Sequence, residues 1–176
     1  MSKELLIVVD YQKDFVDGSL GFEQAVTLEQ PIYDKILAYK ERGQDVIFTL
    51  DTHGQNYLDT REGEGLPFMH CLRESDGWQL YGKVAALCDA STRCFEKSTF
   101  GSLELAQYLR EEGYERIELV GVVTNICVIS NAILAQAALP QAYIFVDASC
   151  CASNDPAMHD KALDVMVGLQ MQITHR

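Results

Sequence analysis

The segment ELVGVVTNICVISNAILAQAAL, residues 118–139, joins a short apolar run to a longer stretch with helical periodicity. The aliphatic start favours a buried strand, and the spacing of the later apolar residues favours a helix. A strand that turns sharply into a helix is the repeating unit of parallel α/β sheets. Cys127 falls at the corner between the two. Its thiol either packs in the core or reacts, depending on what the rest of the chain places beside it.

The same alternation extends along the whole chain in both directions from this corner. Since a strand–helix repeat gives a parallel sheet with helices on both faces, we predict an α/β fold: a three-layer, doubly wound, mostly parallel sheet in one domain, residues 1–176. The expected strands are 4–10, 45–51, 92–97, 116–122, 142–148 and 171–174, and the expected helices are 31–43, 102–113, 125–139 and 155–170.

Composition narrows the choice of partners. The chain has 176 residues, 48% of them hydrophobic, with a formal net charge of −12 and no basic cluster. Nucleic acids and anionic membranes attract basic surfaces, so both are excluded as expected partners. The N-terminus resembles no signal peptide, and the six cysteines show no C-x-x-C spacing. We therefore expect free thiols and a cytoplasmic protein.

Charged residues recur where the expected strands end. In open parallel sheets, sites form outside the carboxyl ends of the strands, so these positions share one rim. They are Asp10, Asp51, Lys97, the 121–127 corner and Asp147.

Asp10, Lys97 and Cys127 together would form a catalytic group with Cys127 as the nucleophile. The start of a helix and the Lys97 ammonium favour a thiolate at Cys127, and Asp10 could accept and return its proton. Backbone N–H groups at the helix start could bind a developing oxyanion. The sequence therefore indicates covalent catalysis by Cys127.

A second group of polar residues lies in an unusually long connection, residues 51–82. Asp51 and His53 alternate at the end of a strand and therefore point the same way, and His70 follows a glycine-rich turn that could bring it back. One carboxylate and two imidazoles suit a zinc, iron or manganese ion. We predict a metal site in this loop.

Three segments resemble the signature motifs of the isochorismatase-like cysteine hydrolases, a group that includes nicotinamidases and pyrazinamidases. They are LIVVDYQKDFV (6–16), FEKSTFGS (95–102) and VGVVTNICVISNA (120–132). The resemblance implies a catalytic triad of Asp10, Lys97 and Cys127. It also implies a cis peptide between Val122 and Val123, with the amides of Val123 and Cys127 as the oxyanion hole.

The nicotinamidase branch implies more about the substrate. Asp51, His53, Glu62 and His70 would hold one divalent metal ion, zinc in the first place, with iron or manganese as alternatives. That ion would bind the pyridine nitrogen, and Phe15, Phe100 and Leu66 would line the pocket for a flat ring. The implied reaction converts nicotinamide to nicotinate and ammonia, a step of NAD salvage. Relatives are commonly homo-oligomers, and the same is expected here.

Two alternatives stay open at this point. The same triad could hydrolyse another small amide, such as a carbamoyl or ureido compound. A non-catalytic, doubly wound binding module could also place Asp and Lys at its strand ends.

Overall fold

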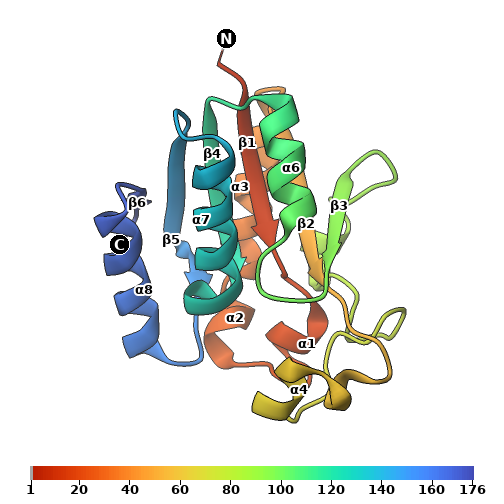
Figure 1. Ribbon diagram of the computed structural model, residues 1–176. Helices are drawn as coiled ribbons and strands as arrows, with labels where there is room; N and C mark the ends of the chain where they lie inside the picture. Colours follow the sequence, from red (N-terminus) through yellow and green to blue (C-terminus); the bar gives the residue numbers. More distant parts are fainter. Residues whose placement is uncertain (1) are drawn as a thin grey trace.

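The computed structural model describes residues 2–176 and contains a six-stranded sheet whose paired strands are all parallel (Figure 1). The sheet order is β3-β2-β1-β4-β5-β6, so the chain leaves β1 in one direction and returns to its other side with β4. This reversal makes the carboxyl ends of β1 and β4 the expected place for a site. The strands are β1 (Glu4–Val9), β2 (Asp45–Asp51), β3 (Arg93–Lys97), β4 (Arg116–Val122), β5 (Tyr143–Ala152) and β6 (Gln172–Thr174).

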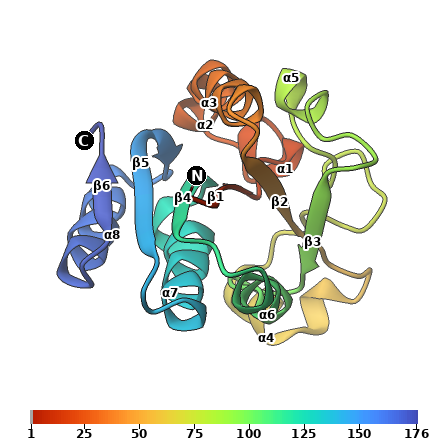
Figure 2. The ribbon, with the colours of Figure 1, turned by 90° about the horizontal axis from the view of Figure 1, so that it is seen from above.

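Helices cover both faces of the sheet, which confirms the predicted three-layer α/β class (Figure 2). One face carries α2 (Glu23–Thr27), α3 (Glu29–Glu41) and α5 (Gly82–Ala85), and the other carries α6 (Leu103–Glu112), α7 (Ile129–Ala138) and α8 (Pro156–Gly168). The apolar run of β1 explains the arrangement, because successive side chains point to opposite faces. Leu5, Ile7 and Val9 pack in one core, and Leu6 and Val8 pack in the other.

The helix boundaries follow local signals. Ser102 caps α6 by accepting a hydrogen bond from the Leu105 amide, and Asp155 caps α8 in the same way from Ala157 and Met158. Helix α3 begins two residues before Pro31, earlier than predicted. Pro31 is tolerated there because amides of the first turn need no partner within the helix.

Strand β5 is longer than predicted, and this corrects the expectation for Asp147. The register between β4 and β5 shifts between Leu119 and Gly121, after which pairing resumes through Cys151 and Ala152. Asp147 therefore lies within a strand and not at its end. A bulge of this kind interrupts the apolar pattern without ending the strand.

The connection after β2 contains short elements that the sequence did not reveal. They are a 3₁₀ turn, η1 (Tyr57–Asp59), and a short helix, α4 (Arg61–Gly65), near the edge where the strands end (Figure 1). Near the same edge lies α1 (Lys13–Val16), directly after β1. None of the helices formed by residues 2–176 is both long and apolar enough to span a lipid bilayer.

Candidate active site

The structure brings Asp10, Lys97 and Cys127 together at the rim where the strands end. The Lys97 ammonium lies 2.6 Å from Oδ2 of Asp10 and 3.5 Å from Sγ of Cys127. All three side chains are buried. The parallel sheet produces this convergence because Asp10 follows β1, Lys97 ends β3, and Cys127 follows β4.

Asp10 is held in an unusual conformation. Its φ is +46°, in the left-handed region that residues with a side chain rarely adopt. Thr49 fixes one carboxylate oxygen, because its hydroxyl donates to Oδ1 at 2.6 Å. Oδ2 is buried and receives no well-aligned hydrogen bond, although the Lys97 ammonium is close. That oxygen keeps a lone pair with which it could accept a proton.

The corner before Cys127 is built by a glycine and a π-helical turn. Gly121 has φ of +113°, and a Cβ there would lie 2.1 Å from the Val9 carbonyl oxygen, so only glycine lets β4 approach β1 so closely. The Val122–Val123 peptide is cis. The turn η2 (Thr124–Val128) then begins the helical segment, with the Val128 amide bonded to the Val123 carbonyl at 3.2 Å. The helix predicted from residue 125 therefore starts as a π turn, a feature frequent at functional sites.

The surroundings of Cys127 oppose the expected thiolate. Burial and the negative charge of Asp10 raise the pKa of Cys127 well above its usual value, and Lys97 offsets them only in part. Burial also raises the pKa of Asp10, which Lys97 opposes. The carboxylate and the thiol therefore compete for one proton beside a fixed ammonium. The proton can move between them within this site.

The four predicted metal ligands also lie together. Nε2 of His53 is 2.9 Å from Oδ2 of Asp51, Nε2 of His70 is 3.3 Å from the same oxygen, and Oε1 of Glu62 lies 3.7 and 3.8 Å from these two nitrogens. Donors around a tetrahedral ion with bonds of about 2.0–2.1 Å are separated by about 3.3 Å. All four donor atoms lie within 4.8 Å of one another, so the set fits one small divalent cation.

Neighbouring groups orient the predicted metal ligands and change their pKa values. Nδ1 of His70 donates to the Phe68 carbonyl at 2.7 Å, which directs the lone pair of the other ring nitrogen, Nε2, towards the ligand set. Burial and the charge of Asp51 raise the pKa of Glu62, as expected for two carboxylates crowded around a place for a cation. Oδ1 of Asp51 lies 3.3 Å from the Lys97 ammonium. Through the Lys97 ammonium, Asp51 thus links the predicted metal ligands to Asp10 and Cys127.

A cavity of about 150 Å³ opens between the two groups. Drug-sized ligands occupy pockets of roughly 300–1,000 Å³, so this cavity suits a much smaller molecule. The expected pocket residues Phe15, Leu66 and Phe100 all line it, and so do both residues predicted for the oxyanion hole, Val123 and Cys127. Apolar walls with Cys127 and the predicted metal ligands Asp51, Glu62 and His70 in the lining would suit a small, flat, partly polar compound. Further lining residues that the sequence did not single out are Leu20, Phe22, Ile126 and Asn154.

The structure gives His159 of α8 a partner at the corner before Cys127. Its Nδ1 lies 2.8 Å from the Thr124 hydroxyl, and its ring is half-buried. Burial lowers the pKa of His159, which favours the neutral ring. Thr124 directly follows the cis peptide, so His159 braces the corner from α8. No motif in the sequence links these two positions, which are 35 residues apart.

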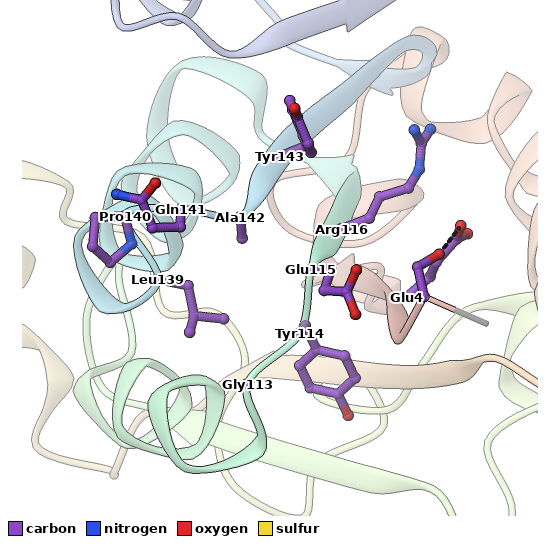
Figure 3. A pocket seen from close by; sticks show the side chains of 11 residues that line it. Glu4, Gly113, Tyr114, Glu115, Arg116, Leu139, Pro140, Gln141, Ala142 and Tyr143 are labelled. Carbon is purple, nitrogen blue, oxygen red and sulfur yellow. Dashed lines mark hydrogen bonds between the residues drawn. The ribbon is translucent and has the colours of Figure 1, made fainter.

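A larger hollow of about 660 Å³ lies at the opposite end of the sheet, where the strands begin (Figure 3). It is formed by the starts of β1, β4 and β5 and by the turn after α7, and its lining includes Tyr114, Arg116 and Leu139. None of the predicted site residues is among the residues that line it. Size alone therefore does not mark the candidate active site in this fold.

Comparisons with known proteins agree with this geometry. A sequence profile of the isochorismatase domain matches residues 4–175. An isochorismatase family protein of Bacillus subtilis, PncA, is 30% identical over 142 residues, covering 74% of this chain and 77% of that protein.

Solved structures show the same likeness. The nicotinamidase/pyrazinamidase PncA of Bacillus subtilis superposes with a TM-score of 0.86 at 28% identity, covering 97% of this chain and 98% of that one. The pyrazinamidase of Pyrococcus horikoshii, solved in complex with zinc, gives a TM-score of 0.86 at 25% identity and covers 99% of both chains. The chain therefore belongs to the isochorismatase family of hydrolases.

Proposed function

We propose that this protein hydrolyses a small aromatic amide, with nicotinamide as the preferred substrate and nicotinate and ammonia as products. One observation carries the proposal. The Lys97 ammonium contacts Asp10, Asp51 and the Cys127 sulfur at once, so a nucleophile and a metal-ligand set meet at one small cavity. Similarity to nicotinamidases supports the choice of substrate.

In the proposed mechanism, Asp10 takes the proton of the Cys127 thiol while the sulfur attacks the amide carbon. Lys97 stays charged, because the carboxylate of Asp10 and the other negative groups around it raise its pKa although burial opposes its charge. It stabilises the negative charge that passes between Asp10 and the sulfur. The amides of Val123 and Cys127 would bind the oxyanion of the tetrahedral intermediate.

The intermediate collapses when the C–N bond breaks and Asp10 returns its proton to the leaving ammonia. Asp10 then removes a proton from water, which attacks the thioester. The C–S bond breaks, the acid leaves, and Cys127 recovers its proton from Asp10. Each proton therefore passes through the oxygen of Asp10 that lacks an aligned hydrogen bond.

Asp51, His53, Glu62 and His70 would hold a divalent metal ion, which we propose is zinc. When bound, the ion would supply a Lewis-acidic coordination position for a ring nitrogen of the substrate. Phe15, Leu66 and Phe100 would enclose the ring, so that the amide carbon faces Cys127. The proposal places the reaction in the cytoplasm, in agreement with six free thiols.

The proposal is tested by measuring ammonia release from nicotinamide, from benzamide, which lacks the ring nitrogen, and from a panel of carbamoyl and ureido compounds. We expect turnover of nicotinamide, little turnover of benzamide, and none by Cys127→Ala. Cys151→Ala is the matched control, because Cys151 is equally buried in the same core but does not line the cavity. An active Cys127→Ala enzyme would exclude the covalent mechanism. Faster turnover of a carbamoyl or ureido compound than of nicotinamide would show that nicotinamide is not the preferred substrate.

A further inference from the structure

Two of the six cysteines face each other outside the candidate active site. Sγ of Cys88 and Sγ of Cys94 are 3.2 Å apart. Cys94 is exposed and Cys88 is partly exposed, whereas the other four cysteines are buried. We propose that Cys88 and Cys94 form a reversible dithiol–disulfide site that reacts with peroxide-class oxidants before any other thiol of the protein.

A tight turn holds the two thiols together. Asp89 organises it, because its carboxylate accepts hydrogen bonds from the amide and hydroxyl of Ser91 at 2.8 and 2.5 Å. The Thr92 amide also donates to the Asp89 carbonyl at 2.9 Å. A turn stabilised in this way limits the conformations that must be searched before the sulfur atoms meet. The sulfur atoms need to approach by only about 1 Å to reach the disulfide length of about 2.05 Å.

The surroundings also favour reaction at Cys88. The ammonium of Lys40 donates to the Leu87 carbonyl at 2.7 Å and lies 3.8 Å from the Asp89 carboxylate, so one positive charge contacts both residues that flank Cys88 in sequence. A nearby cation favours the thiolate, the reactive form of cysteine. A hydrogen bond from Cys94 lowers the pKa of Cys88, with a smaller contribution from Lys40, while burial and the negative charge of Asp89 act in the opposite direction. We assign Cys88 as the attacking sulfur and Cys94 as the resolving one.

The chemistry balances with one peroxide molecule. The Cys88 thiolate attacks one peroxide oxygen, the O–O bond breaks, and the sulfur becomes a sulfenic acid as hydroxide leaves, which becomes the first water by taking up the proton that the Cys88 thiol had released. Cys94 then attacks that sulfur, the S–O bond breaks, and the second water leaves with the remaining thiol proton. Two sulfur atoms lose two electrons in total, and the two peroxide oxygens gain them.

The other thiols are poorly placed for this reaction. Cys127 is buried in the candidate active site, and burial raises its pKa well above the usual value. Cys150 and Cys151 are adjacent in β5, but they pack in cores on opposite faces of the sheet. The protein therefore contains an internal control for accessible and inaccessible thiols.

Trypsin makes the test direct, because it cleaves after Arg93. The fragments 84–93 and 94–97 carry one cysteine each, and Cys127 lies in a separate fragment, 117–161. Native protein is treated with increasing hydrogen peroxide, free thiols are alkylated after denaturation, and the fragments are identified by mass spectrometry. We expect the linked pair 84–93/94–97 to become the main product while fragment 117–161 is still fully alkylated. Dithiothreitol should restore both free peptides.

Two variants sharpen the result. In Cys94→Ser the resolving thiol is absent, so a sulfenic acid should accumulate at Cys88 and be trapped by dimedone. In Cys88→Ser the remaining thiol should react much more slowly. The proposal is overturned if the linked pair does not form, if Cys127 is oxidised first, or if Cys94→Ser gives no dimedone adduct. Because the readout is the thiol itself, this result is independent of ammonia release.

Discussion

Two lysines in this fold, one buried and one partly buried, each lie between two carboxylates, and only the buried one belongs to the candidate active site. Lys97 contacts Asp10 at 2.6 Å and Asp51 at 3.3 Å. Lys35, on α3, contacts Glu118 of β4 and Asp147 of β5, each at 2.7 Å. In both places, two acids compensate the positive charge of a lysine that is shielded from water. The arrangement by itself does not indicate catalysis.

The two clusters differ in how completely their oxygens are bonded. Asp147 also accepts hydrogen bonds from the amide and hydroxyl of Ser149 and lies 3.0 Å from Nδ1 of His175. The second oxygen of Glu118 accepts a hydrogen bond from the Tyr39 hydroxyl at 2.7 Å. Oδ2 of Asp10, in contrast, contacts the Lys97 ammonium at 2.6 Å but receives no further hydrogen bond of good geometry from the residues that the structure describes. A saturated cluster stabilises the fold, whereas an unsaturated carboxylate beside a thiol and a cavity can move protons.

The largest expected difference comes from neutralising one acid in each cluster. Asp10→Asn should lower kcat for ammonia release by roughly a thousandfold, because general acid–base groups contribute about 10²–10⁴. Glu118→Gln removes one of the two negative charges beside Lys35 and should leave kcat unchanged in the folded enzyme. Steady-state kinetics on both variants, corrected for folded fraction, provides the measurement. Equal losses of kcat would show that the clusters do not differ in role.

Removing the metal should have the next largest effect. Chelation, or His53→Ala, should lower kcat/KM for nicotinamide by about 100-fold, because a substrate misplaced by about 1 Å reacts that much more slowly. Metal analysis of the purified protein should give one ion per chain, lost in His53→Ala. His175→Ala is the control for losing a histidine, since His175 belongs to the other cluster. Full activity after complete removal of metal would exclude a metal-positioned substrate.

The Lys35 cluster should dominate stability instead. Lys35→Met leaves Glu118 and Asp147 without their shared cation and should lower the free energy of unfolding by about 2 kcal/mol. Fully buried pairs reach about 3–5 kcal/mol, and the value is lower here because the Lys35 side chain is 17% exposed. Urea denaturation measures this change, and kcat/KM should stay at the wild-type level. An unchanged midpoint would mean that the cluster does not stabilise the fold.

The same cluster predicts a pH dependence. Burial opposes the charge of Asp147, but Lys35 and Ser149 lower its pKa overall. A lowered pKa stabilises the fold above the unfolded value of about 3.9 and loses that contribution as the pH falls below it. Burial likewise opposes the charge of Lys35, but Asp147 and Glu118 raise its pKa, so its contribution is present below about 10.4 and lost above it. The difference in stability between wild type and Lys35→Met should therefore shrink at both extremes of pH.

The comparison also shows what sequence can and cannot reveal. Asp10, Lys97 and Cys127 were predictable because each ends or follows a buried parallel strand, and such ends share one rim. Asp147 looked like the same kind of residue, but β5 continues past a bulge that no residue pattern indicates. Asp51, His53 and His70 were predictable as candidate metal ligands from their residue types, and Glu62 from the family resemblance. Their convergence depends on η1 and α4, which are too short to produce a periodic signal.

Contacts between distant polar residues were beyond sequence reasoning. Lys35 lies on a helix and Glu118 on a strand, 83 positions apart, and no residue pattern pairs them. The raised pKa of Cys127 was also not predictable, because it depends on how deeply the thiol is buried beside Asp10. The fold follows from the pattern of apolar residues, whereas the electrostatics of a site follows from its packing.

The smallest expected effect is a difference in kcat between two histidine variants. His159 contacts the corner before Cys127, and His175 contacts the Lys35 cluster. His159→Ala removes the contact with the Thr124 hydroxyl, 2.8 Å away at the corner before Cys127. A lost hydrogen bond of about 1 kcal/mol should reduce kcat roughly fivefold by loosening the corner, with little change in KM. His175→Ala removes a comparable contact to Asp147 and should leave kcat unchanged. If both variants reduce kcat equally, the loss reflects general destabilisation, and His159 has no specific role in positioning the nucleophile.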